Sequence, residues 1–441
     1  MNRRKFTRTS AGLLATAIAP GVWSCQRPPA VAKAKKTFEF ATVRPGEFPV
    51  PITRVTPDDG FYVHTYYDVC PFSPSQRYLA VTKLPYQDHN AVFGDTAEVC
   101  VIDLEAHTIE TVYTTKSWGF QTGANVNWGA TDKHLFTNDV IGDRAVCVRI
   151  DLETGETKAF AGSLYHIAPD ESCVISFPLE LLDITQPGYG VPSKDPKNPQ
   201  KLPPGAAKDE GVWRTDLKTN ERRLLVSLAD IAAKLPGPLP RNDGTFYFWH
   251  SRFNPQGTRI HQITRCIFPD KQGGENSTVF TFNADGSDIR FLPTDPVWGL
   301  PGGHPNWHTD GDHLIRNLPI DGKPNRLCQW KSDGSEFTVL NQKVEVGGHP
   351  RIEPAGKLVV TDAFPRENGV QHVALRLIDI KSGDEEKLCS LPTVDRDRSP
   401  AAVLRLDGHP NWTRDFKKVI FQAAPEGSRQ LFVADLSARL G

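Results

Sequence analysis

The sequence has no surplus of charge of either sign. Its 441 residues include 51 Lys and Arg against 52 Asp and Glu, and the formal net charge is -1. A chain without a basic surplus has no electrostatic footprint for nucleic acid or for an anionic membrane surface. Because 39% of the residues are hydrophobic, extended disorder is excluded as well.

Long apolar runs and paired cysteines are also absent. No stretch reaches the roughly 20 apolar residues that a membrane-spanning helix needs. The cysteines after Cys25 include no Cys-x-x-Cys pair and no Cys/His zinc-finger spacing. They are Cys70, Cys100, Cys147, Cys173, Cys266, Cys328 and Cys389. We interpret them as buried thiols on strands, with a disulfide in an oxidising compartment as the alternative.

Several catalytic motifs are missing. The chain contains no P-loop, no G-x-G-x-x-G, no H-E-x-x-H and no G-x-S-x-G elbow. The sequence signatures of nucleotide-binding proteins, zincins and serine hydrolases are therefore absent. What the chain does have is 35 Gly and 36 Pro, which favour many turns over long helices.

The first 36 residues have the pattern of an export signal. Arg3-Arg4 precede a mildly apolar run over 13–20, which resembles the twin-arginine signals of proteins exported in folded form. Cys25 follows a possible lipoprotein cleavage site at 22–24. We therefore expect an exported, periplasmic protein, either lipid-anchored at Cys25 or secreted, whose fold starts after a linker that ends at residue 36.

Two short patterns alternate along the remainder of the chain, seven times each. The first pairs a polar or His position with a following aromatic or aliphatic residue and a Pro or Gly turn. Its copies begin at Val69, Asn125, Leu164, His250, His304, His349 and His409. The second is a strand that ends in a tight turn, with copies that begin at Val101, Ile150, Thr215, Phe282, Trp330, Ile378 and Val433. Each pair supplies the strands and hairpin turns of one four-stranded blade.

Seven such blades predict one all-β domain over 37–441, a seven-bladed β-propeller, because antiparallel blades bury both faces by stacking around an axis. The last blade is one strand short at Leu436, while 37–52 precedes the first motif, so we expect the N-terminal strand to close the ring. An open sandwich accounts for neither count. The turns resemble those of WD40-like and TolB-type propellers. A Pro/Gly-rich loop at about 183–210 is expected to cover one mouth of the channel.

Four consecutive blades carry histidine where the innermost strand begins, beside the channel. These residues are His250, His304, His349 and His409. Imidazoles from adjacent blades would converge at one end of the channel, where three or four of them suit a divalent metal. Asp407 is a further ligand candidate and Asp362 a candidate to orient a ligand. The alternative is that the histidines form hydrogen bonds between blades and lock the ring. We interpret six others as surface or structural residues: His64, His89, His107, His134, His313 and His372.

The run Gly303-His304-Pro305-Asn306-Trp307, with Gly348-His349 and Asp407-Gly408-His409-Pro410 after it, resembles the C-terminal half of the seven-bladed oligogalacturonate lyases and, more loosely, the propeller ulvan lyases. The resemblance covers roughly 245–441. It implies that His304 is the catalytic base and that His349 and His409 bind a divalent metal, usually manganese. Asp407 stands where that family has another histidine, the family's Gln ligand has no counterpart near 404–406, and His250 is additional.

The resemblance predicts a polysaccharide lyase that cleaves acidic, uronate-containing oligosaccharides, oligogalacturonate or ulvan, by β-elimination. Its candidate proton donor is Tyr189 in the long loop. Candidate substrate contacts are Arg252, Arg351 and Arg405 for carboxylates or sulfates, and Gln121, Asn125 and Trp128 for hydroxyls and stacking. The alternative is a non-catalytic, TolB-like periplasmic propeller that binds a protein or a saccharide on its rim.

Overall fold

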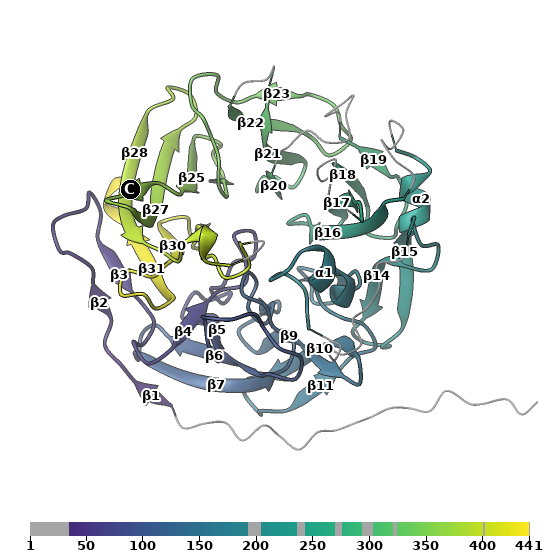
Figure 1. Cartoon of the computed structure of the whole chain (residues 1–441), viewed down its shortest axis with the longest axis horizontal. Helices are drawn as coiled ribbons and strands as arrows, with labels where there is room; N and C mark the ends of the chain where they lie inside the picture. Colours follow the sequence, from purple (N-terminus) through teal and green to yellow (C-terminus); the bar gives the residue numbers. More distant parts are fainter. Residues whose placement is uncertain are drawn as a thin grey trace, which may run out of the picture.

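The computed structural model of the protein describes residues 35–192, 204–235, 243–269, 276–292, 303–320, 324–399 and 402–440. Over these residues seven antiparallel sheets stand in a ring around a central axis (Figure 1). The predicted seven-bladed β-propeller is therefore confirmed. The predicted leader up to residue 34, including Cys25, and positions 193–203 of the long loop lie outside the described residues.

Blades one to four follow one another along the chain. Blade one comprises β4 (Phe61–Val63), β5 (Tyr78–Leu84), β6 (Ala97–Asp103) and β7 (Thr108–Thr115), with β1 (Lys36–Thr37) paired outside β7. Blade two comprises β8 (Asn127–Trp128), β9 (His134–Ile141), β10 (Arg144–Asp151) and β11 (Thr157–Ala159). Blade three comprises β12 (His166–Ile167), β13 (Cys173–Ser176), β14 (Gly211–Asp216) and β15 (Arg222–Ser227). Blade four comprises β16 (Thr245–Phe253), β17 (Arg259–Ile267), β18 (Asn276–Asn283) and β19 (Arg290–Phe291).

Blades five to seven complete the ring. Blade five comprises β20 (Gly303–Trp307), β21 (His313–Pro319), β22 (Asn325–Lys331) and β23 (Thr338–Val339). Blade six comprises β24 (Arg351–Ile352), β25 (Leu358–Ala363), β27 (Val370–Asp379) and β28 (Glu385–Pro392), with β26 (Arg366–Glu367) beside β27. Blade seven comprises β29 (Asn411–Trp412), β30 (Lys418–Ala423) and β31 (Gln430–Asp435), completed by β3 (Ile52–Arg54) and β2 (Ala41–Thr42).

The described helices are short: α1 (Leu179–Thr185), α2 (Leu228–Ala232), α3 (Ser437–Leu440) and the 3-10 turn η1 (Arg396–Arg398). None of them is long and apolar enough to cross a membrane. Helix α1 belongs to the predicted long loop and lies near the centre of the ring, against β16 and β10 (Figure 1).

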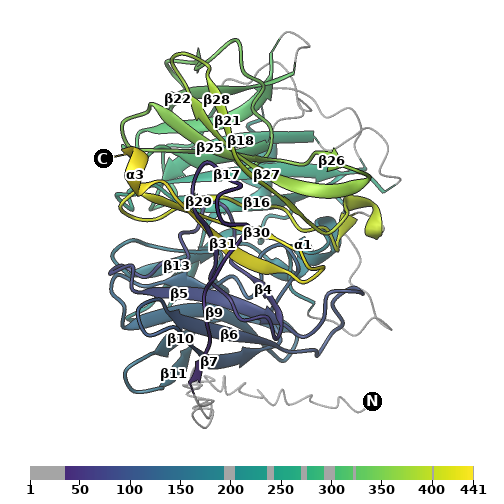
Figure 2. The same cartoon turned by 90° about the vertical axis from the view of Figure 1, so that its left-hand side faces the viewer.

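The N-terminal strand closes the ring, as predicted. In blade seven Thr53 of β3 pairs with Val433 of β31, antiparallel, so the first part of the chain supplies the outer strand of the last blade. Figure 2 shows the purple N-terminal strands running beside the yellow C-terminal ones. This pairing supplies the strand that the last blade lacked, and it holds the two ends of the domain together.

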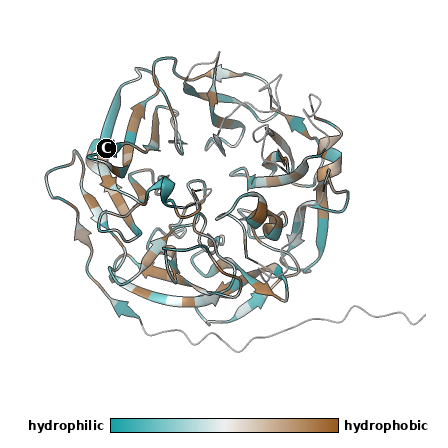
Figure 3. Cartoon of the chain, in the orientation of Figure 1, coloured by the Kyte–Doolittle hydropathy of each residue, from teal (hydrophilic) through white to brown (hydrophobic). Residues whose placement is uncertain are grey.

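Alternating side chains explain why the sheets stack. Hydrophobic and hydrophilic residues alternate along many blade strands (Figure 3), and the apolar ones fill the spaces between neighbouring blades. Between blades six and seven, for example, Val360 and Val373 pack in one buried cluster with Phe421 and Phe432. The seven cysteines after Cys25 are free thiols, and six of them are buried in such strands.

A tryptophan repeat joins adjacent blades on the channel side. The indole nitrogen of Trp128 donates to the carbonyl of Pro71 at 2.8 Å. Trp307 and Trp412 make the same kind of bond to the carbonyls of Arg252 and Arg351, at 3.1 and 3.0 Å. Each bond runs from one blade to the blade before it, so the predicted Trp128 sugar platform is instead a buried inter-blade contact, 5% exposed.

Blade one departs from the repeat. Its inner strand β4 ends at Val63, and the pairing resumes only where Phe72 bridges to Leu79. Residues 64–71 leave the sheet between these points. This excursion carries His64, Tyr66 and Tyr67, each 0% exposed, into the interior of the ring.

Candidate metal centre

The position where the inner strands begin has an unusual backbone. Asn125, His250, His304 and His409 all have positive φ, at 51°, 58°, 58° and 46°. In blade six the residue before His349 is a glycine with φ 64°. Left-handed backbone costs about 1–3 kcal/mol at a residue with a side chain, and it persists where the surrounding fold holds it for a purpose. Its recurrence at equivalent positions of four blades points to function at the channel.

Three of the four predicted histidines meet there. The ring centroids of His304 and His349 are 4.0 Å apart, and those of His349 and His409 are 4.5 Å apart. His349 and His409 are buried, whereas His304 is partly exposed. The imidazoles of blades five, six and seven thus share one cluster, with His304 as the member that a dissolved molecule can reach.

The cluster offers a metal-binding set. His349, Asp407 and His409 each present a ligand atom, and these atoms lie within 4.8 Å of one another. Within the described residues, Nε2 of His349, Nε2 of His409 and Oδ1 of Asp407 are buried and lack a hydrogen-bond partner. Buried polar atoms are normally paired, so three orphaned ligand atoms facing one another fit a bound cation. Two imidazoles and a carboxylate suit Mn²⁺, Zn²⁺ or Fe²⁺.

Asp362 orients the candidate ligands His349 and His409 through hydrogen bonds. Its carboxylate accepts from Nδ1 of His349 at 2.9 Å and from the backbone amides of Gly408 and His409 at 3.0 and 3.2 Å. A proton on Nδ1 leaves the lone pair of Nε2 free for a metal. Burial alone would raise the pKa of Asp362, and the bonds from His349 and the amides lower it below its ordinary value.

Gln422 and Arg405 contact the other two ligands. Nε2 of Gln422 lies 3.0 Å from Nδ1 of His409, and Nε of Arg405 donates to Oδ2 of Asp407 at 2.8 Å. Metal binding through Nε2 of His409 calls for a proton on Nδ1, and therefore for the Gln422 amide turned with its oxygen toward that atom. Arg405 uses one carboxylate oxygen of Asp407 and leaves the other for the ion.

The predicted proton donor reaches the same cluster through Arg405. The Tyr189 hydroxyl accepts from the Arg405 guanidinium at 2.6 Å, and its ring lies 5.2 Å from that of Trp249. Tyr189 is buried. The loop after α1 is therefore connected to the candidate metal ligand Asp407 by Arg405, which bonds to both residues.

His250, predicted as a ligand, lies outside this set. Its Nδ1 is 3.5 Å from Asp68, and its ring is 5.0 Å from that of Tyr66. Burial lowers the pKa of His250 to about 4, so the imidazole is neutral at neutral pH. The structure separates His250 from the three ligands because the Tyr66 ring of the blade-one excursion stands between blades.

The predicted substrate contacts are mostly structural in the fold. Arg252 is 2% exposed and pairs with Asp68 through Nε and a terminal nitrogen, both at 2.9 Å. Arg351 donates to Asn306 at 3.3 Å. Arg252 thus links blades rather than facing open solvent, which corrects the expectation that it binds carboxylates or sulfates. Arg351 is partly exposed, and for it this role stays a prediction.

The polar residues predicted from blade two are also engaged. Gln121 donates to the carbonyl of Arg405 at 2.9 Å, and Asn125 to that of Leu164 at 2.7 Å. Both side chains are buried. The Gln121 bond fixes the segment that carries Asp407, so its contribution to the site is indirect.

Sequence reasoning missed the residues that blade one supplies. His64 was interpreted as a surface or structural residue, but it is fully buried, and its ring is 6.2 Å from that of His409. Burial lowers the pKa of His64 to about 4. The only available signal was the aromatic and acidic run Tyr66-Tyr67-Asp68 directly before the first repeat copy.

Two further arginines were also missed. The guanidinium of Arg265 stacks on Trp249 at 4.1 Å. Burial, then His349 and His250, and also the charge of Arg265 hold the pKa of His304 well below its ordinary value. Burial, followed by the charge of Arg265, lowers the pKa of Arg316 to about 10. Arg265 therefore adds positive charge to the surroundings of His304.

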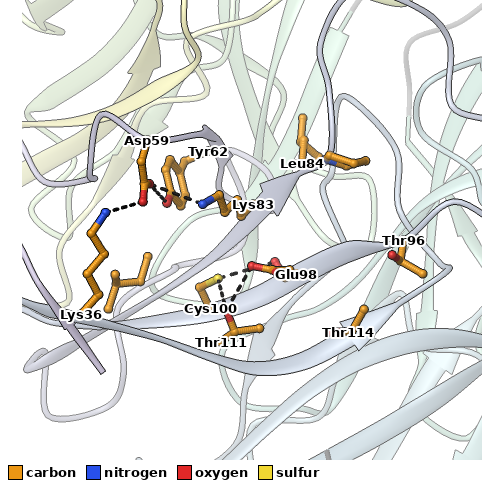
Figure 4. A pocket seen from close by; sticks show the side chains of 12 residues that line it. Lys36, Asp59, Tyr62, Lys83, Leu84, Thr96, Glu98, Cys100, Thr111 and Thr114 are labelled. Atoms are coloured by element: carbon orange, nitrogen blue, oxygen red, sulfur yellow. Dashed lines mark hydrogen bonds and ion pairs between the residues drawn. The ribbon is translucent and has the colours of Figure 1, made fainter. Parts of the chain in front are cut away.

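A second pocket, of about 430 Å³, lies on blade one (Figure 4). Lys36 and Lys83 both reach the carboxylate of Asp59, and the Tyr62 hydroxyl donates to it at 2.8 Å. Burial alone would raise the pKa of Asp59, but the bonds from Lys36 and Tyr62 lower it to about 2. Glu98 also lines the pocket, so its two lysines and two carboxylates balance, and the pocket joins β1 to blade one.

Comparisons with known proteins agree on the fold. A solved "Oligogalacturonate lyase in complex with manganese" is 18% identical, with a TM-score of 0.65 over 91% of this chain and 97% of that chain. An oligogalacturonate lyase from Vibrio parahaemolyticus is 17% identical, with a TM-score of 0.64 over 91% of this chain and 98% of that chain. No family model and no curated protein matches the sequence. Identity this low establishes a shared architecture, and the chemistry has to be argued from the site.

Proposed function

We propose that the protein is a metal-assisted polysaccharide lyase that cleaves uronate-containing oligosaccharides by β-elimination. The observation that carries the proposal is the cluster in which three orphaned ligand atoms, on His349, Asp407 and His409, adjoin the partly exposed His304. The structurally similar oligogalacturonate lyases, one of them with manganese, support the same chemistry.

The difficult step is removal of the proton at C5 of the uronate, because the resulting charge is delocalised only into the neighbouring carboxylate. His349, Asp407 and His409 would hold a divalent ion, manganese first, and such an ion would supply positive charge against that carboxylate, worth on the order of several kcal/mol. Arg265 and Arg405 add cationic charge on the protein side. Neutralising the carboxylate makes the C5 proton acidic enough for a side chain to remove.

His304 is the base in this scheme. The burial and positive charge around it keep the imidazole neutral at neutral pH, so a ring nitrogen has a lone pair to accept the C5 proton. Its partial exposure lets the substrate approach, and its contact with His349 would put the base next to the charge that stabilises the carbanion formed at C5. Tyr189 and Arg405 belong to the same wall of the site.

The test is direct. Manganese-loaded protein is incubated with oligogalacturonate and, separately, with ulvan, and the ultraviolet absorbance of the unsaturated uronate is followed. We expect product from one of them, and a loss of at least about 100-fold in His304→Asn with the bound metal retained. His313→Asn, a partly exposed histidine of the same blade, is the matched control. Absence of product from all acidic oligosaccharides leaves a non-catalytic, TolB-like binding propeller.

We also propose that the protein is exported to the periplasm, with Cys25 as a possible lipid-attachment site. The support is the Arg3-Arg4 leader pattern. A periplasmic location would place the site where imported oligosaccharides arrive.

A further inference from the structure

Tyr66 lies among imidazoles from three other blades. Its ring centroid is 4.5 Å from that of His409, 5.0 Å from that of His250 and 5.9 Å from that of His349. The side chain is fully buried. It reaches this place because 64–71 leaves blade one, so no counterpart of Tyr66 exists in the regular repeat.

Within the described residues the Tyr66 hydroxyl interacts with Tyr189, a polar side chain, but has no well-aligned hydrogen-bond partner. Buried phenols usually find one, because an unpaired polar group loses its hydration without replacement. Two neighbouring tyrosines do find one: Tyr67 donates to the carbonyl of Pro305 at 2.9 Å, and Tyr189 accepts from Arg405 at 2.6 Å. An orphaned hydroxyl next to orphaned metal-ligand atoms fits a partner that arrives with the substrate.

Resting on the lyase function proposed above, we infer that Tyr66, rather than Tyr189, donates the proton to the glycosidic oxygen that departs from C4. His304 takes the C5 proton, and the electrons of the C–H bond form the C4=C5 double bond. The C4–O bond breaks with its electron pair on oxygen, and the phenolic proton of Tyr66 goes to that oxygen. The proton on His304 returns to the phenolate through solvent, so both residues are restored and nothing is oxidised or reduced.

The arrangement separates the two proton transfers. His304 and Tyr66 both contact His349, with ring centroids at 4.0 and 5.9 Å. The base and the donor therefore flank one predicted metal ligand, which is where the uronate carboxylate would be held. An ordinary phenol keeps its proton at neutral pH. Tyr189 differs from Tyr66 in that its oxygen already accepts a hydrogen bond from Arg405.

The experiment compares Tyr66→Phe with wild type on two substrates. One is the oligosaccharide that wild type cleaves. The other is a 4-deoxy-4-fluoro uronide, which keeps the C5 proton and the carboxylate but loses fluoride, a leaving group that needs no proton. We expect Tyr66→Phe to lower kcat on the oligosaccharide by about 100- to 10,000-fold, and on the fluoride by less than about tenfold.

Tyr165→Phe is the matched control. Tyr165 is also a buried tyrosine with an orphaned hydroxyl, but its ring lies against Phe177 at 4.6 Å and beneath Arg252. We expect its kcat on both substrates to stay within about threefold of wild type. Bound manganese and Tm are measured for each variant. Because the Tyr66 hydroxyl is unpaired, its removal is expected to leave Tm unchanged or higher.

Three outcomes overturn the assignment. An active wild type with a Tyr66→Phe loss that is equal on both substrates shows a structural or binding role. An active wild type with no loss in Tyr66→Phe, or with the selective loss in Tyr189→Phe instead, shows that Tyr66 is not the donor. A wild type inactive on both substrates overturns the lyase function itself, and the assignment of Tyr66 with it.

Discussion

Asp362 binds His349 through side chain and backbone at once. Its Oδ1 accepts the backbone N–H of His349 at 2.7 Å, and its Oδ2 accepts from Nδ1 at 2.9 Å. The same carboxylate reaches the amide of His409 in the next blade at 3.2 Å. One buried acid thus holds two turns from different blades in the register that the metal site needs.

Asp362→Asn is expected to lower the affinity for manganese by about 10- to 100-fold, because the amide no longer fixes the proton on Nδ1 of His349 with a full charge. Titration calorimetry with Mn²⁺ measures this. Asp379→Asn, at the partly exposed end of β27 in the same blade, is the control and should leave the affinity unchanged. Equal affinity in Asp362→Asn and wild type would show that the carboxylate serves the fold alone.

Manganese itself should stabilise the protein. At a free concentration 100 times Kd, a ligand specific for the folded state adds about 2.7 kcal/mol, so a chelator should lower Tm and Mn²⁺ should restore it. We expect His349→Gln to abolish the manganese-dependent rise in Tm, and His250→Gln to keep it. If His250→Gln also abolishes the rise, His250 is a ligand as the sequence suggested, and the set in the structure is incomplete.

Stability of the metal-free protein should depend on the buried histidines. The folded pKa of His64 and of His250 is about 4, against about 6.5 in an unfolded chain. Below pH about 6.5 the unfolded state therefore binds more protons, and stability falls as the pH drops toward 4. Each histidine contributes a slope of about 1.4 kcal/mol per pH unit within that window.

Urea denaturation between pH 4 and about 7 measures these slopes. His250→Gln should flatten the dependence by about one proton, while replacement of the exposed His89 should leave it in place. An unchanged slope in His250→Gln would contradict the low folded pKa.

Trp128→Phe should cost stability rather than substrate binding. The substitution removes the bond to the Pro71 carbonyl and leaves that acceptor unpaired, at a cost of about 1–3 kcal/mol. Trp307→Phe, at the equivalent position of blade five, should cost a similar amount. Urea denaturation gives the first quantity, and KM on the cleaved oligosaccharide should not change. A raised KM with unchanged stability would restore the sugar-stacking role for Trp128.

Export can be tested on the leader alone. Residues 1–36 fused to a reporter that folds before transport should carry it to the periplasm, and Arg3-Arg4→Lys-Lys should keep it in the cytoplasm. Cys25→Ala distinguishes a lipid-anchored protein from a secreted one, because only the lipid-anchored protein would lose its association with the membrane. A reporter that stays in the cytoplasm with the intact leader contradicts the prediction.

The repeat made the fold predictable. A strand pattern with an Asp turn recurs once in each blade, and in the structure Asp151 and Asp216 each accept backbone amides two and three residues on. Such turn chemistry is local and can be seen in the chain. The closing strand was also predictable, because the strand count showed that blade seven was one strand short.

The site was predictable only where it follows the repeat. His304, His349 and His409 occupy equivalent positions, and the structure brings them together. His250 shares the position but not the cluster. The side chains around it come from an irregular excursion in blade one, and nothing in a repeat says where an irregular segment will go.

The sequence by itself determined the blades, their number, the closing strand, four histidines at equivalent positions of consecutive blades and Asp407 two residues before the last of them, because each can be seen in local patterns and turn residues. Only the tertiary structure decided that His250 lies apart from the other three histidines, that Arg252 and Trp128 hold blades together, and that Tyr66 enters from the first blade. Those relations join residues of different blades, and they arise from how seven sheets close around a space that side chains must fill.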